Sequence, residues 1–288
     1  MIRSWLFVPG DQARKIDKAF SSGADALIFD WEDAVAPANK QAARSVLSAA
    51  LAARAAWPAE KPLVFIRING WDTTFIDDDL IALPVAHIHG VVLPKSCGPA
   101  DVVRLGERLR GLEQAAGVAQ GTLQIVAVAT ETAASVLALT DFRLPVPGLA
   151  GLMWGAEDLA ADLGVFRNRD AAGTYRAPFL LARNLTVLAA AAAGTLAIDA
   201  VYTDFRDLAG FRAECQAARD DGFQAKAAIH PDQVAIINAV FSGTADEQAW
   251  ARRVIAAFEA GDGVAVLDGK MIDVPHWRLA RRLLGEGR

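Results

Sequence analysis

The sequence contains few of the residues that form disulfide frameworks or cysteine-based metal sites. It has two cysteines, Cys97 and Cys215, and four histidines in 288 residues. The cysteines are far apart and fall in no metal-binding spacing, so neither a disulfide framework nor a cysteine-ligated zinc site is implied. We therefore expect both thiols to be chemically inert, as in a protein of the reducing cytoplasm.

Long hydrophobic runs are missing as well. The longest, residues 187–198, is rich in alanine and includes Gly194 and Thr195. It is too short to span a bilayer, which takes about 20 apolar residues. Near the N-terminus only four apolar residues precede Pro9, too few for a signal peptide. We expect a soluble cytoplasmic protein that does not associate with membranes.

The chain also lacks an excess of basic charge. Its 29 basic residues are outnumbered by 34 acidic ones, which gives a formal net charge of −5. This balance argues against nucleic-acid binding, although local basic clusters can still bind a phosphorylated small molecule. With 53% hydrophobic and 22% charged residues, the chain can bury a large core and is not disordered.

Short apolar, β-prone runs recur along the chain, and polar residues, proline or glycine follow each of them. We expect about eight strands, at residues 5–8, 26–29, 63–68, 90–93, 123–129, 148–154, 197–202 and 223–229. Segments with helical spacing lie between them, at residues 11–22, 39–56, 131–139, 158–163, 178–193, 208–220 and 231–241. Apolar strands that alternate with helices favour a parallel sheet covered on its outer side. The pattern predicts an α/β protein with a (β/α)8 TIM barrel over residues 1–245.

A doubly wound sheet is the alternative to this barrel. No G-x-G-x-x-G sequence follows the first strand, which removes the main support for a dinucleotide fold. The pattern changes after residue 245: a helix is expected at 247–260, then an apolar stretch at 264–267, a turn at Gly269 and a basic helix to about 284. We interpret residues 246–288 as a C-terminal helical extension of the barrel.

Polar residues follow the predicted strands at the end of a barrel where active sites lie. Arg67 ends the third strand and Lys95 follows the fourth. Acidic residues follow the second, fifth and sixth strands: Asp30, Glu32, Asp33, Glu131, Glu157 and Asp158. Crowded carboxylates raise one another's pKa unless a cation separates them. Because oxygen ligands favour magnesium or manganese, the pattern predicts a Mg²⁺-dependent enzyme that acts on an oxygen-rich anion.

Nine sequence motifs, in this order, resemble the citrate lyase beta-subunit-like family of the HpcH/HpaI aldolase superfamily, which includes malyl-CoA and citramalyl-CoA lyases. The motifs are RSWLFVPG, ADALIFDWEDAV, VFIRING, GVVLPK, ATETAASV, GLMWGAEDLAADLG, AIDAVYTDFRD, GFQAKAAIHPDQV and DGKMIDVP. They extend from Arg3 to about Ala280. The resemblance implies a (β/α)8 barrel that assembles into homotrimers or hexamers and cleaves 3-hydroxy-acyl thioesters with Mg²⁺.

The same resemblance implies a role for each residue near the metal. Glu131 and Asp158 match the two direct metal ligands of the family. Glu32 and Asp33 match residues that hold metal-bound waters. Arg67 matches the residue that binds the substrate carboxylate or carbonyl and stabilises the enolate. These five residues are therefore the expected centre of the site.

The resemblance also indicates a proton carrier and contacts to coenzyme A. Asp273 is similar to an acid/base that these lyases supply from the C-terminal segment of a neighbouring subunit, so residues 246–288 are expected to pack on that subunit. Arg14 and Lys18, after the first strand, and Lys95 are candidates to contact coenzyme A. The exposed face of a surface helix explains Arg14 and Lys18 equally well.

Several of these residues have purely structural explanations. Glu131 would be a first-turn helix residue after Thr130 as cap, and Asp158 would complement a helix N-terminus. Glu32 and Asp33 would cap a turn or form ion pairs with a basic residue of the next helix, Lys40 or Arg44. Arg67, at a strand end, would only bridge Asp30 or Asp33. Asp273 would cap the last helix, since it stands two residues before a proline, and His230 would form a cap and turn.

The leading functional hypothesis is a lyase that splits malyl-CoA or citramalyl-CoA into acetyl-CoA and a 2-oxo acid. A citrate lyase beta subunit that acts on a citryl thioester of an acyl-carrier protein is the first alternative. A pyruvate aldolase and a binding relative without catalysis are the others. The sequence specifies neither the acyl group nor the number of subunits.

Overall fold

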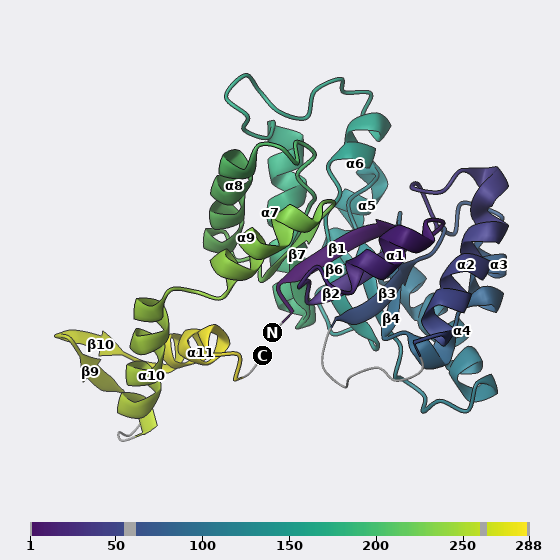
Figure 1. Cartoon of the computed structure of the whole chain (residues 1–288). Helices are drawn as coiled ribbons and strands as arrows, with labels where there is room; N and C mark the ends of the chain where they lie inside the picture. The colour runs from purple at the N-terminus through teal and green to yellow at the C-terminus, as the bar shows by residue number, and fades with distance from the viewer. Residues whose placement is uncertain (1, 55–61, 260–263, 287–288) are drawn as a thin grey trace.

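The computed structural model describes residues 2–54, 62–259 and 264–286. Eight parallel strands form a closed barrel in chain order, and β1 pairs with both β2 and β8 (Figure 1). The strands are β1 (Ser4–Pro9), β2 (Ala26–Asp30), β3 (Leu63–Arg67), β4 (Gly90–Leu93), β5 (Gln124–Val128), β6 (Leu149–Met153), β7 (Leu196–Asp199) and β8 (Ala225–Ala228). The predicted (β/α)8 barrel is confirmed, and the doubly wound alternative is wrong.

Helices cover the outside of the barrel. They are α1 (Ala13–Ala19), α2 (Lys40–Ala52), α3 (Ile76–Ala82), α4 (Pro99–Ala115), α5 (Ala133–Ala138), α6 (Glu157–Asp162), α7 (Ala177–Ala193), α8 (Leu208–Asp220) and α9 (Pro231–Phe241), with 3-10 turns η1 (Pro37–Asn39), η2 (Val85–His87) and η3 (Leu139–Asp141). The sequence pattern did not predict α3 and α4. Part of the helix predicted at 39–56 lies outside the described residues. No helix among those described is long and apolar enough to cross a membrane.

The core has two layers. Alternate strand residues fill the barrel interior, where Trp5 and Phe65 pack with their ring centroids 4.9 Å apart. The other strand residues pack outward against the helices. Gly90 permits this interior packing, because a β-carbon there would lie 2.6 Å from the Phe65 ring and 2.1 Å from the carbonyl oxygen of Gln124. The barrel is thus a filled core that leaves its ends free for function.

The C-terminal extension consists of α10 (Ala245–Glu259), a hairpin of β9 (Ala265–Leu267) and β10 (Lys270–Ile272), and α11 (Val274–Leu283). Its second strand was not predicted. Asp268 and Gly269 join the strands, and both have positive φ, as a tight hairpin turn requires. The buried side chains of the extension form a hydrophobic cluster separate from the barrel core.

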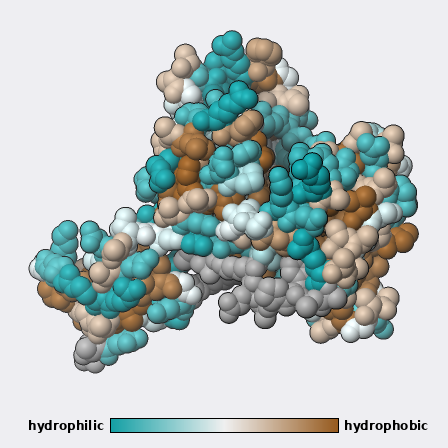
Figure 2. Space-filling view, in the orientation of Figure 1, coloured by the Kyte–Doolittle hydropathy of each residue, from teal (hydrophilic) through white to brown (hydrophobic). Residues whose placement is uncertain are grey.

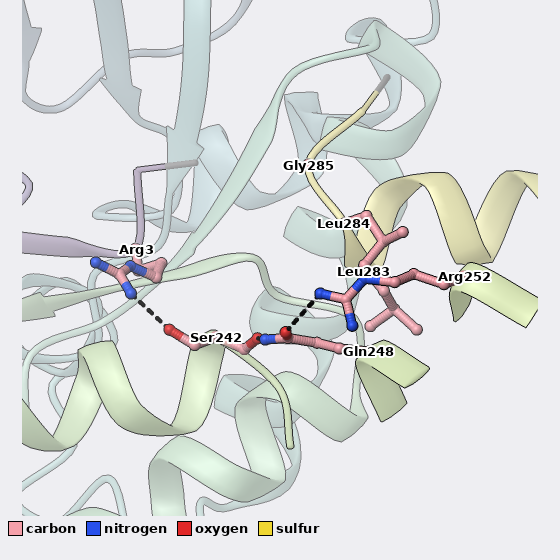
Figure 3. A pocket seen from close by; sticks show the side chains of 7 residues that line it. All are labelled: Arg3, Ser242, Gln248, Arg252, Leu283, Leu284 and Gly285. Atoms are coloured by element: carbon pink, nitrogen blue, oxygen red, sulfur yellow. Dashed lines mark hydrogen bonds between the residues drawn. The ribbon is translucent and has the colours of Figure 1, made fainter. Parts of the chain in front are cut away.

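A single connection after α9 joins the extension to the barrel, and the extension stands apart from it (Figure 1). Figure 3 shows the junction, where the Arg3 side chain, just before β1, donates a hydrogen bond to Ser242. A cavity of about 400 Å³ lies there between the barrel and the extension. Because Arg3 precedes β1, the extension leaves the barrel at the N-terminal ends of the strands, opposite to the end where active sites form.

Candidate active site

Arg67 is fixed at the C-terminal end of β3 by Asp30 at the end of β2. Its Nε donates to Asp30 Oδ1 at 2.8 Å and its Nη2 to Asp30 Oδ2 at 2.6 Å. Asp30 in turn accepts hydrogen bonds from the backbone N–H groups of Glu32 and Ala34. Burial favours loss of the Arg67 proton, but Asp30 and Glu32 outweigh it and raise the pKa of Arg67. The site therefore contains a permanent, oriented positive charge.

Glu32 lies between two cations. Its carboxylate oxygens are 2.9 Å from Arg67 Nη1 and 2.9 Å from Lys95 Nζ. Asp33 is more exposed and stands 4.0 Å from the same two cations. The suggested pairing of these acids with the next helix is wrong for Glu32: Lys40 Nζ donates to the backbone carbonyl of Glu32, not to its carboxylate. Burial raises the pKa of Glu32, although Arg67 and Lys95 oppose the shift.

Glu131 follows β5 and is 3% exposed. It precedes α5, whose cap is Thr132, so the explanation of Glu131 as a helix residue after a Thr130 cap is wrong. Burial, followed by the negative charges of Glu32 and Asp158, raises the pKa of Glu131 to about 8. Glu131 thus belongs to a group of like charges at the mouth of the barrel.

Asp158 lies in the first turn of α6, half-buried. It lines a cavity of about 80 Å³ together with Glu131 and Arg67. The cavity wall includes Gly155, where a β-carbon would approach Glu131 Cγ to 3.0 Å. Within the described residues, no group of three or more His, Cys, Asp and Glu is arranged to hold a metal. The two carboxylates of Glu131 and Asp158 at this cavity fit a hard cation that completes its shell with water or substrate, as Mg²⁺ does.

Other candidate residues lie away from this cavity. Arg14 and Lys18 are exposed on α1, and neither lines it. Asp273 caps α11 in the extension, where its Oδ1 lies 2.7 Å from His276 Nδ1. One chain therefore brings together Arg67, Glu32, Asp33, Lys95, Glu131 and Asp158 but not Asp273. His230 forms the predicted cap, at the start of α9.

A buried lysine beside the site was not predicted as important. Lys226 in β8 is 0% exposed, and its ammonium donates to Asp199 Oδ2 at 2.6 Å and to Glu214 Oε1 at 3.0 Å. Its strand neighbours Ala225 and Ala227 face the barrel interior, so Lys226 points outward to the helices. It cannot form a Schiff base with a substrate in the cavity. In the sequence, this lysine alternates with alanines in a predicted strand, and that pattern could have identified it as a buried charge.

The ion pairs of Lys226 with Asp199 and Glu214, here called the Lys226 network, support the cavity wall. Asp199 Oδ1 accepts a hydrogen bond from the Trp154 indole at 2.7 Å, and Trp154 lines the cavity. Burial opposes ionisation of Asp199, but Lys226 and Arg183 outweigh it and lower the pKa of Asp199. The network is therefore charged, and it positions the segment that leads to Asp158.

The comparison with known families fits this geometry. A profile of the HpcH/HpaI aldolase/citrate lyase family matches residues 3–231. The chain belongs to this family. It is 37% identical over 290 residues to a (3S)-malyl-CoA thioesterase of Cereibacter sphaeroides (strain KD131 / KCTC 12085), which covers 99% of the chain and 94% of that relative. It is also 35% identical over 271 residues to a citrate lyase subunit beta-like protein of Mycobacterium tuberculosis, covering 94% of the chain and 90% of the relative.

Solved structures of this family share the fold. A crystal structure of the protein CitE from Mycobacterium tuberculosis, in complex with magnesium, acetoacetate and coenzyme A, aligns with a TM-score of 0.78 at 32% identity. The alignment covers 99% of the chain and 97% of CitE. A second structure, the citrate lyase beta subunit from the same organism with oxaloacetate and magnesium, aligns with a TM-score of 0.69 at 33% identity and covers 83% and 96%.

Proposed function

We propose that this chain is a Mg²⁺-dependent carbon–carbon lyase that cleaves malyl-CoA or citramalyl-CoA into acetyl-CoA and a 2-oxo acid. The observation that carries the proposal is the cavity that Glu131, Asp158 and Arg67 line together. Support also comes from the related CitE structure, which holds magnesium, acetoacetate and coenzyme A. The protein would act in the cytoplasm as a homotrimer or hexamer, with Arg14 and Lys18 as candidate coenzyme A contacts.

Glu131 and Asp158 would hold the metal, and Glu32 and Asp33 would orient its waters. Bound Mg²⁺ supplies a Lewis acid for the carboxylate and hydroxyl oxygens of the substrate. Arg67 binds the substrate carboxylate or carbonyl and lies close to the enolate that forms as the carbon–carbon bond breaks. Because Asp30 holds the guanidinium in place, this stabilisation needs little rearrangement during the reaction.

The proton of the substrate hydroxyl needs an acceptor, and we assign this role to Asp273 of a neighbouring subunit. The extension leaves its own barrel at the end opposite to the cavity, so its own Asp273 is poorly placed. The hairpin also carries an uncovered apolar pair: Val266 and Met271 face each other across the strands and are 71% and 65% exposed. Figure 2 shows such hydrophobic side chains among polar ones on the extension. A second subunit would cover them.

A thioesterase is the second candidate, because a 37% identical relative is named as one. It would hydrolyse the thioester and leave the carbon chain intact. A third is a citrate lyase beta subunit, since the chain is 34% identical to that of Leuconostoc mesenteroides subsp. cremoris. That enzyme would need a citryl thioester on a carrier protein.

One assay separates these candidates. The purified protein is incubated with Mg²⁺ and malyl-, citramalyl- or citryl-CoA, and both 2-oxo acid and free thiol are measured. A lyase releases 2-oxo acid without free thiol, whereas a thioesterase releases free thiol without 2-oxo acid. If no substrate yields a 2-oxo acid, the lyase proposal for free coenzyme A esters is rejected. Cleavage of only carrier-bound citrate would then identify a citrate lyase subunit.

A further inference from the structure

Lys95 adopts a backbone conformation that is unfavourable for a residue with a β-carbon. Among the described residues, Lys95 and Asp268 are the two non-glycine residues with positive φ, each at 50°. Asp268 precedes Gly269 in a hairpin turn, where this conformation is expected. Lys95 follows β4 and belongs to no hairpin. A left-handed residue outside such a turn persists only where its surroundings hold it, and such residues cluster at functional sites.

The conformation lets Lys95 contact two acidic residues at once. Its backbone N–H donates to Glu131 Oε2 at 2.5 Å, while its ammonium donates to Glu32 Oε1 at 2.9 Å. Both carboxylates are almost fully buried, at 3% and 4% exposure. They follow different strands, β2 and β5, and repel each other. The left-handed turn therefore places one donor and one cation of a single residue between two buried carboxylates.

We propose that Lys95 is a positioning residue for the metal site. Its backbone orients Glu131, which would hold the metal, and its ammonium neutralises the Glu32 carboxylate and fixes it in place. This assignment replaces the expectation that Lys95 contacts coenzyme A, since its ammonium is already engaged by Glu32 and lies 4.0 Å from Asp33. It deepens the proposed function and rests on it, but metal binding can be measured without any substrate.

The test compares Lys95→Ala with Lys95→Gly, which both lack the ammonium and differ only in the β-carbon. At an ordinary φ, glycine is the less stable of the two residues. At a positive φ this order reverses, so we expect Lys95→Gly to unfold at a higher temperature than Lys95→Ala. The pair Asp268→Ala and Asp268→Gly should show the same order and serves as the control for strain. The opposite order at residue 95 would overturn the proposal, which depends on this positive φ.

Metal binding is measured by titrating Mn²⁺ into each protein and following the electron paramagnetic resonance signal of the unbound ion. We expect both Lys95 variants to bind Mn²⁺ at least about threefold more weakly, with Lys95→Ala the weaker, and both Asp268 variants to bind normally. Unchanged or tighter binding in the Lys95 variants would overturn the positioning role.

Kinetics provide an independent readout if the wild-type protein cleaves a coenzyme A thioester. A positioning residue affects kcat, and we expect a loss of about tenfold or more with KM changed less than twofold. A coenzyme A contact would raise KM and leave kcat and Mn²⁺ binding intact, which would reject the proposal. If the wild type cleaves nothing, the proposed function fails, whereas the unfolding and Mn²⁺ measurements still decide the role of Lys95.

Discussion

Glu131 combines a position at the mouth of the barrel with a cost to the stability of the fold. It is buried beside two other carboxylates, and in the absence of metal its pKa is raised to about 8. A buried acid that resists ionisation destabilises the folded state at every pH where the unfolded chain ionises it. A bound divalent cation would remove this penalty. Binding of metal and stability of the fold are therefore coupled through one side chain.

This coupling predicts a pH dependence. The raised pKa means that the folded state binds the Glu131 proton more tightly, so its contribution to stability is present below the unfolded pKa, near 4.5, and is lost as the pH rises towards about 8. In urea unfolding with a chelator, we expect wild-type protein to lose on the order of 3–5 kcal/mol between pH 5 and pH 8 from this group. Glu131→Gln should lose much less.

Glu131→Gln keeps an acceptor for the Lys95 N–H, which makes it a conservative control for packing. Added Mg²⁺ should restore wild-type stability at pH 8 and have little effect on the variant. If both proteins show the same slope in the chelator, Glu131 is not the group responsible. The raised pKa of Glu32 would then be the next candidate.

At the level of single residues, the sequence predicted which acids gather at the barrel mouth, because strand ends of a barrel converge. It did not predict the geometry among them. The bidentate pairing of Arg67 with Asp30 depends on the register of β2 and β3. The role of Lys95 depends on a backbone angle, and that of Lys226 on the side of β8 that it faces. None of these has a signature in residue type alone.

At the level of elements, the strands were predictable because they are apolar throughout, and two of the helices were not. The longest undetected one, α4, has an apolar stripe of Val102, Leu105 and Leu109 that packs on the barrel. Two glycines, Gly106 and Gly111, and a high charge content obscured this spacing. The predicted start of α5 at residue 131 is also wrong, because the capping box of Thr132 and Ser135 marks the true boundary.

Substitution by alanine is expected to have opposite effects on stability at two glycines. At Gly90, alanine would place a β-carbon 2.1 Å from the Gln124 carbonyl oxygen, so Gly90→Ala should cost about 3 kcal/mol or more of unfolding free energy. At Gly111, inside α4, nothing lies within 4 Å of an added β-carbon. Gly111→Ala should therefore stabilise by about 0.5–1 kcal/mol. Urea denaturation of both variants measures these changes, and a neutral Gly90→Ala would show that β4 and β5 separate more easily than their packing indicates.

For the whole molecule, the sequence predicted the extension but not where it stands. Its direction is set by contacts between distant segments. Gly243, with φ of 74°, lies at the joint after α9, and Arg219 of α8 forms a 2.8 Å ion pair with Glu247 of α10. A β-carbon at Gly243 would lie 3.2 Å from Arg219 and 3.3 Å from Glu247. These contacts hold the extension away from its own cavity.

The placement of Asp273 gives a test of the assembly. In Glu131→Gln the cavity is defective but Asp273 is intact, and in Asp273→Asn the reverse holds, so we expect each variant alone to be inactive. If Asp273 acts in a neighbour's site, mixed oligomers contain sites with both residues intact. Random equal mixing in a ring gives such a site about one time in four, so about a quarter of the wild-type activity should return.

Recovery of activity would exclude action of Asp273 within its own chain. If Asp273 acted there, no site in a mixed oligomer would have both residues intact. Native mass spectrometry establishes that subunits have exchanged before activity is measured. Each variant carried alone through the same exchange procedure gives the baseline activity. Exchanged oligomers that remain at this baseline would place Asp273 in the site of its own chain and would reject the assignment to a neighbouring subunit. Activity that returns in proportion to the fraction of mixed neighbours would place Asp273 at the boundary between subunits.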